Sequence, residues 1–346
     1  MSKSIWLGLL AIATLGASPA PGPAPYTVGV VYWSMHIAGQ VAMRQGLERE
    51  ADAINRRPSG PRVRLESAVG GDGEAGVTHQ RLAVDNLLAR RPDALIIQPI
   101  DSAALAAPVR RANAIGVPVV AYDQYVIQGK LACYLTSNNM LAGRLNGEYL
   151  AHRFRHRTAS KPLRLAIVEY PYVSSTVERV EGLQDALKES GVPYRIVGRY
   201  EGVEPIGGEA AGRRILAEHP PGTLDAVFCV NDGGGVAVMR VLESAGRKDV
   251  VMATIDGDPA AVAAIRRGGL IGIDTAQFCG PLGAEAMRWT YRLLKKEPVP
   301  RQVLLTVFPI TRENVASYPG WMGPIPPRIL KPWPPHAPVP GTEIVW

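Results

Sequence analysis

Residues 225–257 have the sequence DAVFCVNDGGGVAVMRVLESAGRKDVVMATIDG, in which two apolar runs flank an amphipathic segment. The runs at 226–230 and 250–255 are short and rich in strand-forming residues, as strands buried on both faces of a sheet are. Between them, 236–244 carries apolar residues at helical spacing, and Gly246 follows as a helix end. The pattern predicts two parallel strands joined through a helix by a right-handed crossover.

A polar residue stands at the end of each of these strands, Asn231 after the first and Asp256 after the second. Parallel strands end at the same edge of their sheet, so we expect both side chains at that edge. In open α/β sheets this carboxyl edge is where ligands bind.

The alternation of strands and helices continues through most of the chain. We expect further strands at 26–31, 63–68, 94–97, 117–121, 131–135, 163–168, 194–197, 270–273 and 303–308. Helices are expected near 39–55, 75–90, 139–154, 176–189, 207–217, 259–267 and 282–295, and a further helix after the strand at 94–97 is expected to end at 115. Since 346 residues exceed what one core usually serves, the prediction is an α/β protein of two doubly wound parallel-sheet domains.

The composition, with 47% hydrophobic and 20% charged residues, is typical of a globular protein. The net charge of +7 is spread over amphipathic helices without a basic run, so no nucleic-acid partner is expected. His152 and His156 are one helical turn apart but lack a third metal ligand. The glycines at 233–235 follow a strand without a Walker lysine. We therefore predict neither metal nor cofactor.

A secretory signal peptide is predicted for residues 1–25. Lys3 precedes an apolar run at 5–17, and Ser18, Pro19 and Ala20 provide small residues near a cleavage point. The run is too short to span a bilayer, and a short uncleaved anchor is the alternative. The protein is expected in the periplasm.

Three cysteines, Cys133, Cys229 and Cys279, occur without a CxxC motif. An odd number in an exported chain leaves at least one thiol unpaired. We expect them to be small buried apolar residues.

Residues 319–346 are rich in proline and differ from the rest of the chain. Proline removes backbone donors and fixes φ, so this segment is expected to be an extended tail and not a helix or inner strand. Its tryptophans, Trp321, Trp333 and Trp346, favour packing on the body, although a free tail is the alternative.

Polar and aromatic residues recur where the predicted strands end. Carboxylates and amides pair with hydroxyl groups, and aromatic faces stack on sugar rings. A cleft lined this way suits a neutral polyhydroxy ligand. The predicted ligand-binding residues are Trp33, Asp123, Gln124, Asn231, Asp256, Gln277 and Phe278. No nucleophile, base and orienting group assemble into a catalytic site, and an enzyme on this fold is the disfavoured alternative.

The chain resembles the periplasmic sugar-binding proteins of the ribose- and xylose-binding type, which share their fold with the ligand-binding part of lac-repressor-like proteins. The resemblance covers about residues 26–318. It rests on VVAYDQ (119–124), SNNMLAGRLNGEYLA (137–151), ERVEGLQDAL (178–187), VFCVND (227–232), VVMATIDG (250–257) and DTAQF (274–278).

The resemblance implies that Asp123, Asn231, Asp256 and Gln277 hold sugar hydroxyls, while aromatics at Trp33 and Phe278 enclose the ring. It also implies an arginine at position 124, where this chain has Gln124. A second arginine is expected on the helix after strand 163–168, where the chain offers Val177 or residues 174–176. Two missing arginines would change which sugar is bound.

The resemblance further implies a hinge of three crossover segments near Thr136, Ala276 and Thr306, with the ligand in the cleft between the domains. The N-terminal domain would comprise 26–136 and 277–305, and the C-terminal domain 137–276 and 306–318. The function implied is an exported, monomeric binding protein that delivers a sugar or polyol to an ABC transporter permease. The alternative is a ligand-sensing module for a signalling receptor.

Overall fold

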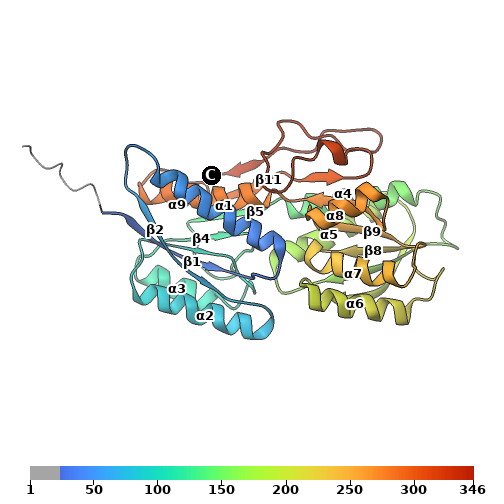
Figure 1. Ribbon diagram of the computed structural model, residues 1–346, viewed down its shortest axis with the longest axis horizontal. Coiled ribbons are helices and arrows are strands. Elements are labelled where there is room, and N and C mark those ends of the chain that lie inside the picture. The colour runs from blue at the N-terminus through green and yellow to red at the C-terminus, as the bar shows by residue number, and fades with distance from the viewer. Residues whose placement is uncertain (1–23) are drawn as a thin grey trace, which may run out of the picture.

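The computed structural model describes residues 24–346, which form two sheets with helices packed against each (Figure 1). The first sheet has the order β13 (Glu343–Val345), β11 (Gln302–Leu305), β5 (Cys133–Ser137), β4 (Val119–Tyr122), β3 (Ala94–Ile97), β1 (Tyr26–Tyr32) and β2 (Val63–Val69). Its strands pair in parallel, except that β13 runs antiparallel to β11.

The second sheet has the order β12 (Phe308–Ile310), β10 (Ile271–Ala276), β9 (Val251–Asp256), β8 (Ala226–Cys229), β6 (Leu163–Glu169) and β7 (Tyr194–Glu201). Here only the β10–β12 pair, at one edge, is antiparallel among the described strands. The predicted fold class, two parallel-dominated α/β domains, is confirmed.

Strand alternation places the first sheet between two helical layers. Val30 and Ile96 face the cluster that contains α1 (Ala38–Asn55) and α9 (Cys279–Leu294), while Val31 and Ile97 face the opposite cluster. That opposite cluster includes α2 (Gly73–Ala89) and α3 (Ala106–Ala114), which lie on the lower side in Figure 1. The sheet is buried on both faces, which is why its strands read as continuous apolar runs.

The second sheet carries the remaining helices. They are α4 (Asn139–Arg153), α5 (Ser174–Glu189), α6 (Pro205–Glu218), α7 (Asp232–Ser244) and α8 (Pro259–Arg267). Helix α4 packs against α5, and α6 packs against α7. The single 3₁₀ helix of the described chain, η1 (Val315–Ser317), lies against α8.

The chain passes between the sheets at three places before the tail begins. It crosses from β5 to α4, from β10 to α9, and from β11 to β12. The single strand predicted at 303–308 is wrong, because the third crossing divides it. Leu305 pairs with Ser137 in the first sheet, whereas Phe308 pairs with Ala276 in the second.

Helix α7 and strand β7 extend furthest beyond their predicted limits. Helix α7 begins at Asp232 and not at 236, because the Asn231 side chain accepts a hydrogen bond from the backbone N–H of Gly234 and caps the helix. Strand β7 continues to Glu201 because it follows β6 along its length.

The proline-rich tail packs on the body and contacts both domains, as the red trace in Figure 1 shows. Ile329, Trp333 and Val339 are buried in the core cluster of the second domain. The chain then returns to the first sheet as β13, which pairs with β11 at the edge. An edge strand fits the sequence, since residues 343–345 are free of proline.

All three cysteines are free and buried, as predicted. The predicted signal peptide lies almost wholly outside the described residues. Among residues 24–346 no helix combines the length and apolar character needed to cross a bilayer.

Candidate functional site

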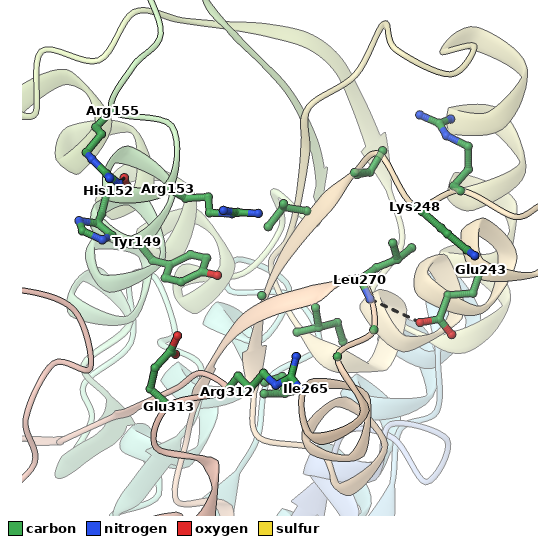
Figure 2. Close-up of a pocket in the computed structure, with 17 residues that line it drawn as sticks. Tyr149, His152, Arg153, Arg155, Glu243, Lys248, Ile265, Leu270, Arg312 and Glu313 are labelled. Atoms are coloured by element: carbon green, nitrogen blue, oxygen red, sulfur yellow. Dashed lines mark hydrogen bonds between the residues drawn. The ribbon is translucent and has the colours of Figure 1, made fainter.

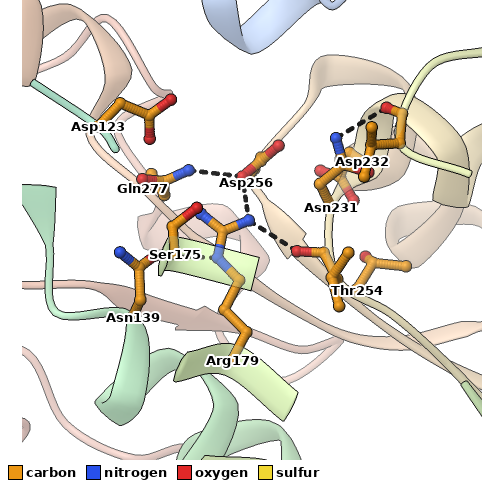
Figure 3. A network of polar contacts seen from close by, with 12 residues as sticks. Asp123, Asn139, Ser175, Arg179, Asn231, Asp232, Thr254, Asp256 and Gln277 are labelled. Carbon is orange, nitrogen blue, oxygen red and sulfur yellow. Dashed lines mark hydrogen bonds and ion pairs between the residues drawn. The ribbon is translucent and has the colours of Figure 1, made fainter. Parts of the chain in front are cut away.

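Six of the seven predicted ligand-binding residues line one small cavity between the two sheets. They come from strand ends and crossings of both domains (Figure 3). The predicted members are Trp33, Asp123, Gln124, Asn231, Asp256 and Gln277, and the lining is completed by Ile37, Gly39, Gln40, Met43, Ser175, Thr176, Arg179 and Val203.

Asp123 is the acidic group that the first domain contributes. It follows β4 with a φ of 66°, a left-handed conformation that a non-glycine residue rarely adopts. Its Oδ2 accepts hydrogen bonds from the side-chain amides of Gln40 (3.0 Å) and Gln98 (3.1 Å). Burial raises the pKa of Asp123 to about 6, against the opposing charge of Arg179. These amide contacts fix the position of the Asp123 carboxylate at the cavity.

Asp256 is the corresponding group of the second domain. It ends β9 with a φ of 139°, a second strained residue at the site. Its Oδ1 accepts hydrogen bonds from Gln277 Nε2 (2.6 Å) and from an Arg179 guanidinium nitrogen (3.2 Å). Burial raises the pKa of Asp256, and the charge of Arg179 opposes that rise.

Arg179 also lines the cavity, and the sequence prediction missed it. It projects from α5 and is only 2% exposed. Its guanidinium also donates to Asn139 Oδ1 (2.9 Å) and to the backbone oxygen of Val230 (2.6 Å). The expectation that this helix lacks a site arginine is wrong.

A signal for Arg179 was present in the quoted ERVEGLQDAL motif. Arg179 shares a face with Thr176, Val180, Leu183 and Leu187, all of them buried at helical spacing. A charged residue within an apolar stripe is buried only with partners, so it marks a site.

The position of Arg179 depends on a close crossing of two helices. A Cβ atom added to Gly143 of α4 would lie 2.0 Å from the Arg179 carbonyl oxygen. A Cβ on Gly182 of α5 would lie 2.1 Å from the Met140 carbonyl oxygen. Only glycine at both positions lets α5 approach α4 this closely, and this approach brings the guanidinium to Asp256.

The amide of Asn231 is engaged locally. Its Oδ1 accepts from the backbone of Gly234 (3.2 Å) and its Nδ2 donates to the Val203 backbone oxygen (2.9 Å). Asn231 thus joins the start of α7 to the loop before α6 at the edge of the cavity.

Of the two aromatic residues predicted to contact a ligand, only Trp33 lies at the cavity. Trp33 lines the cavity, and its ring lies 6.0 Å from that of Tyr170 in the second domain. Phe278 does not line the cavity. It is fully buried in a core cluster. The cavity lining therefore gives no support to the ring contact predicted for Phe278, which stays a prediction.

The two domains are closed on one another at this site. The backbone N–H of Ser175 donates to Gln124 Oε1 (3.2 Å), and the N–H of Tyr125 donates to Ser174 Oγ (3.0 Å). The cavity that remains has a volume of about 20 Å³, on the order of one water molecule. A sugar therefore requires the domains to separate or the lining side chains to move.

A larger concavity of about 740 Å³ lies in the second domain, at the opposite ends of β9 and β10 (Figure 2). Its cationic side chains Arg153, Arg155, Lys248 and Arg312 are exposed to solvent. The buried cation there, Arg247, is paired with Asp249 at 2.7 Å. This surface lacks the buried convergent polar groups of the Asp123–Asp256 site.

No group of three or more histidine, cysteine, aspartate or glutamate side chains within residues 24–346 is arranged to hold a metal ion. His152 and His156 lie at the end of α4 and just beyond it, away from the cavity. The carboxylates of the site face amides and a guanidinium, which is chemistry for binding hydroxyl groups.

A sequence profile of the periplasmic binding protein domain matches residues 28–298. The chain belongs to this family. The ribose import binding protein of Escherichia coli K12 is 26% identical to this periplasmic binding protein over 289 residues, which cover 84% of this chain and 92% of that one. A D-ribose/D-allose-binding protein of Pseudomonas aeruginosa is 31% identical over 184 residues, which cover 50% and 54% of the two chains.

Solved structures share the fold of this periplasmic binding protein. A galactofuranose binding protein superposes with a TM-score of 0.76 at 18% identity, over 85% of this chain and 97% of that one. The fructose binding periplasmic domain of a hybrid two-component system superposes with a TM-score of 0.73 at 20% identity, over 84% of this chain and 92% of that one. The comparisons confirm the resemblance to sugar-binding periplasmic proteins, a family of solute-binding proteins and not of enzymes.

Proposed function

We propose that this protein captures a small neutral sugar or polyol between its two domains. The observation that carries the proposal is the convergence of buried Asp123, Asn231, Asp256 and Gln277 from both domains on one cavity. Carboxylates accept hydrogen bonds and amides both accept and donate, so together they match the two-sided chemistry of hydroxyl groups.

The charges of the cavity favour a neutral ligand. Arg179 is the one cation among the lining residues, and it is already committed to Asp256, Asn139 and Val230. Asp123 then leaves an excess negative charge. An anionic ligand would be buried without a free cation to neutralise it.

Binding proceeds by opening and closing of the domains in this proposal. The moving bodies are 26–136 with 277–305 and 137–276 with 306–318. Opening breaks the Gln124–Ser175 and Tyr125–Ser174 contacts, and closing over the ligand remakes them. The signal-like N-terminus and the periplasmic relatives support an exported protein, and the ribose import relatives support delivery of the ligand to an ABC transporter permease. We propose that it acts as a monomer.

A ligand screen by thermal shift and titration calorimetry tests the proposal. The probes are pentoses, hexoses, deoxysugars, polyols and inositols, with amino acids and nucleosides as controls. A ligand that binds only the folded protein raises its melting temperature. We expect a rise with one polyhydroxy compound and a smaller radius of gyration in its presence. A rise with an amino acid alone would contradict the proposal.

Matched variants locate the site. Asp256→Ala removes the acceptor that Gln277 and Arg179 hold, and should abolish most of the affinity. Asp85→Ala removes an exposed carboxylate paired with Arg111 on the first domain and should leave affinity unchanged. Equal affinity of the two variants would mean that the ligand binds elsewhere.

A sensing role is the second candidate. One solved neighbour is the fructose binding periplasmic domain of a hybrid two-component system, so the fold occurs in signalling proteins as well. Adjacent genes for a permease and an ATPase would favour transport, and a histidine kinase gene would favour sensing.

A further inference from the structure

Two further carboxylates lie behind Asp256, and Figure 3 shows one of them, Asp232, beside the site. Asp232 is the first residue of α7 and Asp274 lies in β10; both are buried and neither lines the cavity. Asp274 Oδ1 accepts a hydrogen bond from the backbone N–H of Gly257 (3.0 Å), and Asp232 Oδ2 accepts one from the backbone N–H of Asp258 (2.8 Å). The pair therefore holds the turn that directly follows Asp256.

The other oxygen of each carboxylate has no donor among the described residues. These atoms are Asp232 Oδ1 and Asp274 Oδ2, both fully buried. The two carboxylates accept from the adjacent N–H groups of Gly257 and Asp258, so both lie at the same turn, and Asp232 contributes to the pKa of Asp274 as a hydrogen-bonding neighbour. Because ionised carboxylates only accept, two charged groups would leave both oxygens unpaired, whereas one added proton would satisfy both.

The surroundings of the pair disfavour two negative charges. Burial, and then the charge of Asp256, raise the pKa of Asp274 to about 8, and burial raises the pKa of Asp232. Asp258 on the α8 side adds a further negative charge to both. Three further titratable groups face this region: Cys229 of β8, Cys279 of α9 and Tyr318 before the tail. Two cations lie nearby. Arg179 of α5 acts on Asp256, and Arg240 of α7 acts on Asp258.

We propose that Asp232 and Asp274 share one proton, and that the protonated pair is a positioning device that holds Asp256 in its ligand-binding place. The inference rests on the proposed function for its ligand-binding consequence. Loss of the shared proton places a second negative charge beside the turn at 257–258. Repulsion then displaces the strained Asp256 from Gln277 and Arg179.

The direction of the pH dependence follows from linkage. A carboxyl group whose folded-state pKa lies above its unfolded value adds stability that is fully present below the unfolded pKa. That stability is lost as the pH rises through the folded value, here about 8. Ligand affinity should fall in the same window, by up to about tenfold per pH unit if binding requires the proton.

The test compares wild type with Asp274→Asn between pH 6.5 and 9.5. The asparagine keeps an oxygen for the Gly257 N–H and supplies an N–H to Asp232, so no shared proton is needed. The matched control is Asp258→Asn, which removes one charge from the same turn and keeps the cap on the Ala260 N–H. Affinity for the sugar identified in the screen and the melting temperature of the ligand-free protein are both measured.

We expect wild type and Asp258→Asn to lose affinity and melting temperature above about pH 8, while Asp274→Asn keeps both nearly constant. Equal alkaline losses in wild type and Asp274→Asn, or no loss in wild type, would overturn the inference. If Asp274→Asn fails to fold, Asp232→Asn tests the pair from the other side. If no sugar binds, the proposed function fails, and the melting curves of the ligand-free protein still decide whether the proton is shared.

Discussion

At the scale of single residues, the buried charge of Arg179 is the feature on which the site depends most. Arg179 is removed from water, but three acceptors surround its guanidinium: Asn139, the Val230 carbonyl and Asp256. A buried charge is tolerated when all of its partners are in place. If one partner is removed, the charge that remains is buried without compensation. The same contacts that stabilise the second domain therefore orient the binding site.

Arg179→Met should destabilise the protein by about 3–5 kcal/mol and abolish ligand binding, because Asp256 is left buried without its cation. Arg144→Met is the control, since the Arg144–Glu189 pair on the same two helices is exposed to solvent, where ion pairs contribute little to stability. Chemical denaturation measures both. Similar losses for the two variants would refute a special role for Arg179.

Ligand affinity should also fall as the pH drops below about 6. Burial raises the pKa of Asp123 to about 6, and the protonated acid loses an acceptor for a ligand hydroxyl. The stability of the ligand-free protein should change in the opposite direction, because a raised carboxyl pKa favours folding at low pH. Calorimetry from pH 5 to 7.5 measures the affinity. In Asp123→Asn the affinity should be weak and independent of pH, and an unchanged acid dependence there would assign it to another group.

At the scale of elements, the crossing of α4 and α5 is the contact that sets the site. Gly143 and Gly182 allow the two backbones to meet. The first crossover enters α4 directly from β5, so this helix pair also lies next to the hinge. A change in the spacing between α4 and α5 would therefore move the Arg179 guanidinium and the first crossover between the domains at the same time.

Gly143→Ala should lower both stability and affinity, although alanine favours helices by about 1 kcal/mol over glycine. The added Cβ would lie 2.0 Å from the Arg179 carbonyl oxygen, and relief of such overpacking costs about 1–3 kcal/mol or more. Gly341→Ala is the control, because no atom lies within 4 Å of its added Cβ. Thermal melting and ligand titration measure the effects; a more stable Gly143→Ala protein would show that the helices separate at no cost.

At the scale of the whole molecule, the tail links the two domains in addition to the three crossovers. The backbone oxygen of Trp321 accepts from Gly280 in the first domain (2.9 Å), and Lys331 then pairs with Glu148 in the second (2.5 Å). Thr306, in the third crossover, donates to the Pro340 carbonyl (2.6 Å) before β13 joins the first sheet. The tail thus covers the hinge side of the molecule.

Deleting residues 341–346 should lower the melting temperature by several degrees, since it uncovers the edge of β11 and removes the Arg301–Trp346 contact. Ile344→Thr is the control, because its exposed side chain changes while the backbone pairing of β13 stays. Differential scanning calorimetry compares the two. An unchanged melting temperature after deletion would mean that β13 adds nothing to stability.

Particular residues show how far the sequence could be interpreted. Asp123, Asn231, Asp256 and Gln277 were predictable because each follows a short apolar run, and parallel strands bring such ends to one edge. Arg179 was missed although its place within an apolar stripe marks it locally, because its partners Asn139, Val230 and Asp256 come from other elements and meet it only in the folded chain. Phe278 was expected beside Gln277 at the cavity, but burial in a core cluster keeps it out of the lining, and the short DTAQF motif does not indicate which of the two side chains is covered.

The sequence by itself determined the α/β class, the two runs of strand–helix units and the chemistry at their carboxyl ends, because periodicity and turn residues act over a few positions. Only the tertiary structure decided that the strand expected at 303–308 divides between two sheets, that Arg179 reaches Asp256, and that Asp232 and Asp274 hold the same turn at 257–258. Each of these features joins residues far apart in the chain. Their contacts depend on helix spacing and sheet register, which are set only when both domains are packed.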